Sequence, residues 1–166
     1  METFLERIRQ FENRCALEDL NSGFCHHLDH GEIEALVDLF CEDAVYSHGS
    51  RVSRGREEIR RLFQQRAESG VRTSRHLQTG LRLQWLSHEL ATGTSVCLTF
   101  AADGPPPIPR TTPYLVADFI DRYRLCRDGR WRIEKRHIER IFTAPDNPGP
   151  VGTALTGPPP PIRTDP

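Results

Sequence analysis

The chain has 166 residues, of which 37% are hydrophobic and 27% are charged. This length and composition suit one soluble globular domain with a single core and exclude a disordered chain. The formal net charge of −1 shows no basic excess, so nucleic acid is not an expected partner.

Helical spacing of apolar residues dominates the first 70 residues. The first apolar stripe contains Phe4, Ile8, Phe11, Cys15, Leu17, Leu20, Phe24 and Leu28. This spacing predicts a helix that Gly31 ends, with a bend within the stripe as one possibility. Two further helices are predicted: one begins near Ile33 and is ended by Glu42-Asp43, and the other covers residues 55–70. A short strand is predicted to begin at residue 44.

From residue 76 onward the apolar pattern has a period of two, which is typical of strands. The predicted strands cover residues 76–85, 90–101, 114–126 and 131–142, and Asp128-Gly129 indicates a hairpin between the last two. One face of the second strand carries only small residues, which leaves room for a close neighbour or for a ligand. Helices followed by strands predict an α+β fold. A strongly curved mixed or antiparallel sheet would wrap around three N-terminal helices as a cone with an internal pocket.

A change in composition near residue 144 predicts the domain boundary. Residues 1–143 are expected to form a single cone-shaped domain. Residues 144–166 contain eight of the 13 prolines and no periodicity. We therefore expect a proline-rich C-terminal tail outside the core.

Three features predict a cytoplasmic protein without a membrane anchor. The cysteines are odd in number and form no C-x-x-C pair: Cys15, Cys25, Cys41, Cys97 and Cys126. This usage favours a reducing compartment. The N-terminus lacks a signal-peptide pattern, and no apolar stretch approaches the length of a membrane span.

Four segments resemble the SnoaL-like branch of the nuclear transport factor 2-like superfamily. They are Leu28-Asp29-His30-Gly31-Glu32 with Leu39 to Val45, Gly55 to Ile59, Arg75-His76 with Leu81-Arg82-Leu83, and Tyr123 to Ile133. The resemblance covers about residues 12–143. It implies the cone fold and, for the dehydratases and the dehydrochlorinase of this branch, a lyase that uses an Asp/His pair and no cofactor.

By this resemblance, Asp29 and His76 are the candidate catalytic residues. A carboxylate beside an imidazole makes a general base at neutral pH without a metal. His76 would remove a proton from carbon, and Asp29 would fix the tautomer of the ring and stabilise the imidazolium. Two alternatives stay open. Asp29 can instead cap the second helix, and His76 can face water, because strand parity does not say which face lines the cone.

The candidate substrate-binding residues are Phe24, Leu28, His48, Arg127 and Asp118. By resemblance, His48 falls where a dehydratase has a pocket tyrosine, and Arg127 is matched with a pocket arginine of the dehydrochlorinase. His48 could stabilise negative charge or protonate a leaving group. Leu28 replaces a tyrosine found in the dehydratases, so a mechanism that polarises the substrate through that tyrosine is not expected.

A near match to a zinc motif does not predict a metal site. Cys25, His27, Asp29 and His30 approximate H-x-H-x-D-H, but the first ligand is cysteine and the segment reads as helix. His26 and His30, four residues apart, could bind a stray transition metal. We expect neither a metal nor a cofactor.

The sequence thus favours a cofactor-free lyase or isomerase acting on a small, mostly apolar organic molecule. One alternative is a non-catalytic binding or scaffold protein of the same fold. Another is an accessory subunit of an oxygenase. A homo-oligomer, either dimer or trimer, is expected because broad curved sheets of this family pair through their outer faces.

Overall fold

The structure is a computed structural model that describes residues 3–109 and 112–144. The elements in chain order are α1 (Phe4–His30), α2 (Ile33–Asp38), β1 (Phe40–His48), β2 (Arg51–Arg54), α3 (Gly55–Glu68), β3 (Arg72–Trp85), β4 (Leu90–Asp103), β5 (Leu115–Leu125) and β6 (Trp131–Thr143). The sheet has six strands in the order β2-β1-β6-β5-β4-β3. Strands β1 and β6 are parallel, and the other neighbours are antiparallel. The predicted α+β class with a mixed sheet is confirmed.

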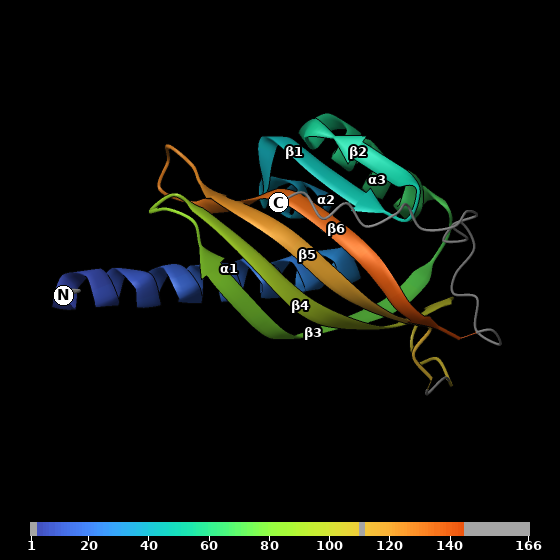
Figure 1. The fold of residues 1–166 in the computed structure, drawn as a ribbon. Helices are drawn as coiled ribbons and strands as arrows, with labels where there is room; N and C mark the ends of the chain where they lie inside the picture. The colour runs from blue at the N-terminus through green and yellow to red at the C-terminus, as the bar shows by residue number, and fades with distance from the viewer. Residues whose placement is uncertain (1–2, 110–111, 145–166) are drawn as a thin grey trace.

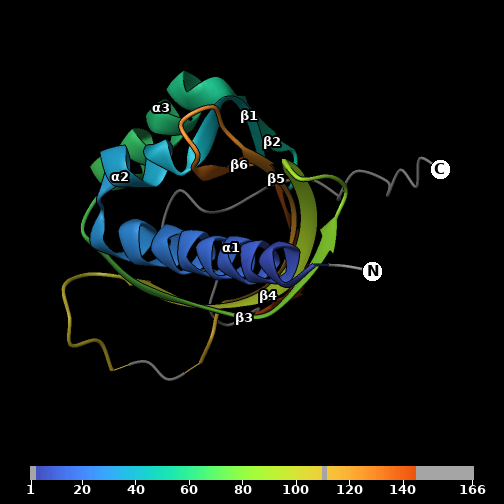
Figure 2. The same cartoon turned by 90° about the vertical axis from the view of Figure 1, so that its left-hand side faces the viewer.

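The sheet curves around the first helix. Figure 1 shows α1 running across the long strands β3 to β6, and Figure 2 shows, end on, the sheet bending around it. Helices α2 and α3 close the side next to β1. This arrangement brings the end of α1 against β3, and the candidate site lies there.

Helix α1 is one continuous helix of 27 residues. It begins with a capping box between Thr3 and Glu6, and it ends at Gly31, whose φ of +71° suits glycine. Its first turns extend beyond the sheet (Figure 1), so Phe4 and Phe11 are 72% and 67% exposed. The first part of the predicted apolar stripe is therefore not core, and burial begins at Leu17.

The chain between α2 and α3 departs from the prediction. Helix α2 ends at Asp38 rather than near Glu42, and β1 begins already at Phe40. Strand β2 was not predicted. The guanidinium of Arg56 donates to the carbonyls of Asp38 and Phe40, which satisfies backbone acceptors where the helix stops. This contact lies 16 residues along the chain from Phe40 and is invisible to local periodicity.

Strand β3 contains a bulge that determines which of its residues face the interior of the cone. Its register against β4 shifts by one residue between Thr79 and Arg82. Gly80 has a φ of +69°, the left-handed conformation that such a bulge uses. A one-residue shift exchanges the two faces of a strand. His76 therefore faces inward before the bulge, and Leu83 and Trp85 face the core after it.

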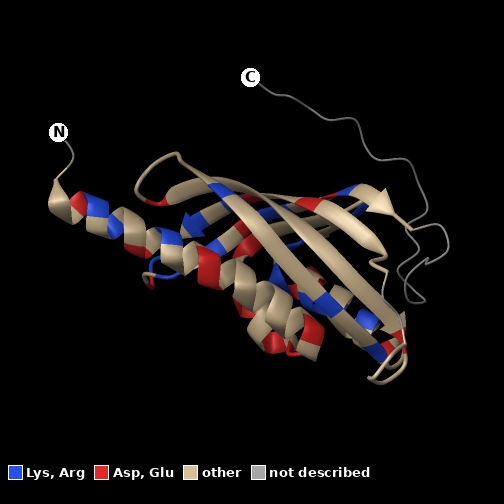
Figure 3. Cartoon of the chain, turned by 90° about the horizontal axis from the view of Figure 1, so that it is seen from below, with Lys and Arg blue, Asp and Glu red and all other residues tan. Residues whose placement is uncertain are grey.

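Three expectations remain predictions: the cytoplasmic location, the lack of a nucleic-acid partner and the proline-rich tail outside the core. Of the described residues, no helix is long and apolar enough to cross a bilayer, and all five cysteines are free thiols. In the view of Figure 3, acidic and basic residues are interspersed along α1 and over the sheet. The proline-rich tail lies outside the described residues, except for Ala144.

Candidate active site

Asp29 and His76 are in direct contact. Asp29 is the next-to-last residue of α1, and its side chain crosses to β3. Its Oδ1 accepts from the Ser74 hydroxyl at 2.7 Å and from His76 Nδ1 at 2.6 Å, and its Oδ2 accepts from the His76 backbone N–H at 2.8 Å. The N-cap of α2 is Glu32, which makes no side-chain capping bond. Asp29 thus joins helix to sheet and does not cap α2.

The hydrogen bonds define the protonation state of the pair. Asp29 is ionised because its hydrogen bonds hold its pKa down: burial alone would raise the pKa, but the bonds from His76 and Ser74 outweigh it. An ionised carboxylate only accepts, so Nδ1 of His76 carries the proton. The lone pair of neutral His76 then sits on Nε2, the nitrogen that would accept a proton from a substrate.

Burial favours the neutral imidazole. The side chains of Asp29 and His76 are 5% and 7% exposed. Burial lowers the pKa of His76, the Asp29 carboxylate opposes this, and the positive charges of Arg66 and Arg72 lower it further. The ring of His76 is therefore neutral at neutral pH. On β4, its register partner is Thr99, which belongs to the buried small-residue face.

A cavity of about 300 Å³ is lined by Asp29 and by its hydrogen-bond partner Ser74, while His76 lies behind them and is not part of the lining. Its polar wall includes Asp29, Ser74, Arg66 and Arg72. Leu28, from the last turns of α1, contributes to the apolar wall. The volume lies at the lower end of about 300–1,000 Å³ for pockets that hold small organic molecules.

His48 also faces the interior. It follows Tyr46 on the inner side of β1, and its Nε2 is buried without a partner among the described residues. Burial, helped by the charges of Arg140 and Arg66, lowers its pKa to about 4. His48 is therefore neutral at pH 7, where it offers a hydrogen bond but not the proton of a charged acid.

Of the five predicted substrate contacts, only Leu28 lines the cavity; Phe24, His48, Asp118 and Arg127 do not. Phe24 is completely buried in the core, with its ring centroid 6.0 Å from those of both Phe40 and Phe119. Asp118 lies on the outer face of β5, because Ala117 and Phe119 on either side of it are buried. It therefore points away from the cone.

Arg127 lies at the far end of the sheet. It is exposed in the turn between β5 and β6, whereas the register of His76 runs through Thr99 to Leu115 at the start of β5. The two positions are separated by the whole length of β5. Arg127 therefore does not lie where the match to a pocket arginine of the dehydrochlorinase would place it.

Arg136 is a fully buried arginine of the interior that was not predicted. It is 0% exposed, forms an ion pair with Asp121 at 2.7 Å and donates to Asn21, while its Nη1 has no partner among the described residues. Its guanidinium lies 4.3 Å from the centroid of the Phe24 ring. Sequence reasoning missed it because a bulge shifts β6 by one residue beyond Ile133, so strict alternation points Lys135 inward instead.

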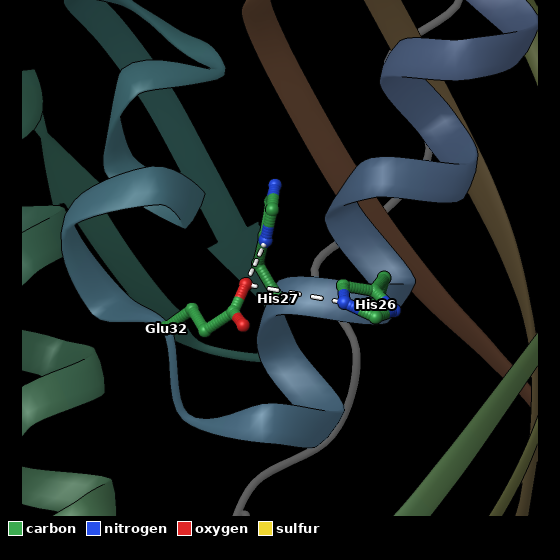
Figure 4. Close-up of side chains that lie close together, drawn as sticks. All are labelled: His26, His27 and Glu32. Carbon is green, nitrogen blue, oxygen red and sulfur yellow. Dashed lines mark hydrogen bonds and ion pairs between the residues drawn. The ribbon is translucent and has the colours of Figure 1, made fainter.

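One group of potential metal ligands lies beside the site. Among the described residues, one ligand atom each from His26, His27 and Glu32 lies within 4.8 Å of the others, as Figure 4 shows. His27 Nδ1 and the Glu32 carboxylate are 2.5 Å apart, and His26 Nε2 is 4.0 Å from the same oxygen. The His27–Glu32 contact spans the turn from α1 to α2 and explains the cluster as a link between the two helices.

The comparisons establish the family. The SnoaL-like domain matches residues 9–137, so the chain belongs to the SnoaL-like family, within the nuclear transport factor 2-like superfamily. The predicted resemblance is confirmed. Comparison with curated protein sequences found no match.

Solved structures share the fold. A proposed scytalone dehydratase from Novosphingobium aromaticivorans is 20% identical, with 90% of this chain and 99% of that chain covered and a TM-score of 0.74. LinA is 22% identical, with 92% and 99% covered and a TM-score of 0.72. A hexachlorocyclohexane dehydrochlorinase, LinA type 2, is 19% identical, with 83% and 91% covered and a TM-score of 0.70. At these identities the likeness shows the cone fold.

Proposed function

We propose that this chain is a cofactor-free lyase or isomerase in which His76 is the general base. The observation that carries the proposal is the 2.6 Å contact between Asp29 Oδ1 and His76 Nδ1, with both side chains almost fully buried. The family and its structural neighbours, which include a dehydrochlorinase and a proposed dehydratase, support the reaction class. The proposed substrate is a small, mostly apolar organic molecule.

The proposed step begins at Nε2 of His76. Its lone pair takes a proton from a carbon that a neighbouring group acidifies, and the C–H electron pair forms a double bond. In an elimination, the leaving group departs from the adjacent carbon with its own electron pair. In an isomerisation, the imidazolium returns the proton to another carbon. Asp29 stabilises the imidazolium through Nδ1.

The cationic interior suits this chemistry. Negative charge develops on the substrate as the proton leaves, and preorganised donors in a buried site stabilise it. Nη1 of Arg136 and Nε2 of the neutral His48 ring are buried without a partner among the described residues, although neither residue lines the cavity. We assign both as candidate charge-stabilising groups and His76 alone as the base.

The experiment compares His76→Ala with His88→Ala, an exposed histidine in the turn after β3. Both variants and the wild type are screened against halogenated and hydroxylated alicyclic and aromatic compounds in D₂O. Products and deuterium uptake are followed by mass spectrometry. We expect His76→Ala to fold normally and to lose about 10²–10⁴-fold in rate, and His88→Ala to keep full turnover.

Three results would count against the proposal. Undiminished turnover by His76→Ala rules out the base assignment. Ligands that bind without any conversion or deuterium exchange favour the rival class, a binding or scaffold protein of the same fold. Stable co-purification with a larger iron-containing chain would favour the oxygenase accessory subunit.

A further inference from the structure

Two arginines with buried, unpaired N–H groups line the cavity beside the Asp29–His76 pair. Arg66 is in the last turn of α3, and Arg72 opens β3. The unpartnered atoms are Nη2 of Arg66 and both Nε and Nη2 of Arg72. Both residues line the same cavity of about 300 Å³ as Asp29. Sequence reasoning did not select either of them.

Buried arginine N–H groups without any ion-pair partner for the side chain are unusual within the described part of the chain. Other partly or fully buried arginines are paired: Arg56 with Asp38 and Glu42, Arg132 with Asp128, and Arg136 with Asp121. Within the described ranges, neither Arg66 nor Arg72 forms an ion pair. A buried guanidinium without acceptors is costly, so an unpaired one in a cavity points to an absent acceptor.

Electrostatics agree with the geometry. Burial, together with the nearby positive charge of Arg66, lowers the pKa of Arg72 to about 10. The carboxylate in the cavity wall does not relieve this, because Asp29 already accepts from Ser74 and twice from His76. The charge of Asp103 opposes the lowering of the Arg72 pKa only in part, so the cavity keeps positive charge that an anionic ligand can neutralise.

The pattern of unpaired atoms specifies the shape of the anion. Nε and Nη2 of an arginine lie on one edge of the planar guanidinium and donate in parallel, which matches the two oxygens of a carboxylate. Arg66 Nη2 supplies a further donor. Most of the remaining wall is apolar, from residues that include Leu28, Ile33, Leu36, Phe63, Ala67 and Val71.

We propose that Arg66 and Arg72 bind a carboxylate of the ligand, whose apolar body fills the cavity towards the Asp29–His76 pair. This names the substrate class, an organic monocarboxylate, and that naming rests on the proposed function. The anion site itself does not rest on it, because the site is defined by unpaired donors and not by the reaction.

The test measures binding of benzoate and of benzamide, its neutral isostere. Dissociation constants are taken from NMR titrations at constant ionic strength, with the arginine Nε–H resonances as the readout. The variants are Arg72→Gln, Arg72→Lys and Arg66→Gln. The control is Arg61→Gln, an exposed arginine on α3. We expect benzoate to bind at least about 10-fold more tightly than benzamide.

Arg72→Gln removes the two parallel donors of the guanidinium and should weaken benzoate binding by about 10- to 100-fold. Arg72→Lys keeps the charge but not the two parallel donors, so we expect an intermediate loss. Arg66→Gln should weaken binding as well, and Arg61→Gln should leave it unchanged. Because Arg72 is unpaired in the free protein, Arg72→Gln should also unfold at the same or a higher temperature, which a structural arginine would not do.

Three outcomes would overturn the anion site. They are equal binding of benzoate and benzamide, unchanged benzoate binding in Arg72→Gln, and no benzoate binding at saturating concentration. Failure of the proposed function is separate. A wild-type chain that binds benzoate through Arg72 but shows no turnover and no deuterium exchange contradicts only the enzymatic proposal.

Discussion

Replacement of Asp29 by asparagine isolates the contribution of the carboxylate. The Asp29 oxygens accept three hydrogen bonds in a side chain that is 5% exposed. Asparagine offers one acceptor oxygen and places an NH₂ group among donors, so at least one donor of Ser74 or His76 loses its acceptor. A charge-assisted bond contributes about 1.5–3 kcal/mol, and we expect the free energy of unfolding to fall by that amount at pH 7.

The assay is urea unfolding of Asp29→Asn beside Asp19→Asn. Asp19 is an exposed acid on the same helix, and its change should alter stability by no more than about 0.5 kcal/mol. Because the folded pKa of Asp29 is lowered, its stabilisation is complete above the unfolded pKa of about 3.9 and is lost as the pH falls through the folded value. The difference between the two variants should therefore shrink below about pH 4. Equal stability of the two variants at pH 7 would refute the reasoning.

The remaining predictions concern His48 and Gly93. The pKa of His48 is lowered to about 4, so the neutral form stabilises the fold above the unfolded pKa of about 6.5, and this is lost as the pH falls towards 4. His48→Gln should flatten the loss of stability between these values in urea titrations; an unchanged slope would contradict it. A Cβ on Gly93 would lie 2.9 Å from Tyr123 Cε2, so Gly93→Ala should cost about 1–3 kcal/mol. An added Cβ at Gly23 would lie no closer than 3.8 Å to another side chain, so Gly23→Ala should instead stabilise α1 by up to about 1 kcal/mol. Thermal unfolding of both alanine variants measures the two effects. The reverse order of the two alanine variants would be the contradicting result.

Much of the fold could be predicted because its signals are local. The start of α3 at Gly55 and the hairpin at Asp128-Gly129 follow from helix and turn preferences that act within a few residues. The end of α2 could not be predicted, because it depends on Arg56, which reaches back to the carbonyls of Asp38 and Phe40. Strand β2 has only four residues, too few for a periodic pattern.

The site could be predicted only in part, for a different reason. Asp29 and His76 were selected by family resemblance, since neither helix period nor strand parity relates two residues 47 positions apart. Parity left the orientation of His76 open because the bulge at Gly80 reverses the inner face partway along β3. The bulge in β6 hid Arg136 in the same way. Arg66 and Arg72 become notable only once their lack of partners is known.

The measurement that tests the central claim most directly is the protonation state of the His76 ring. Nitrogen-15 NMR of the histidine-labelled protein at pH 7, assigned with His76→Ala, distinguishes the two ring nitrogens. The Asp29 contact predicts a neutral ring with its proton on Nδ1 and an unprotonated Nε2. A proton on Nε2, in either the other neutral tautomer or a charged ring, would contradict His76 as the general base.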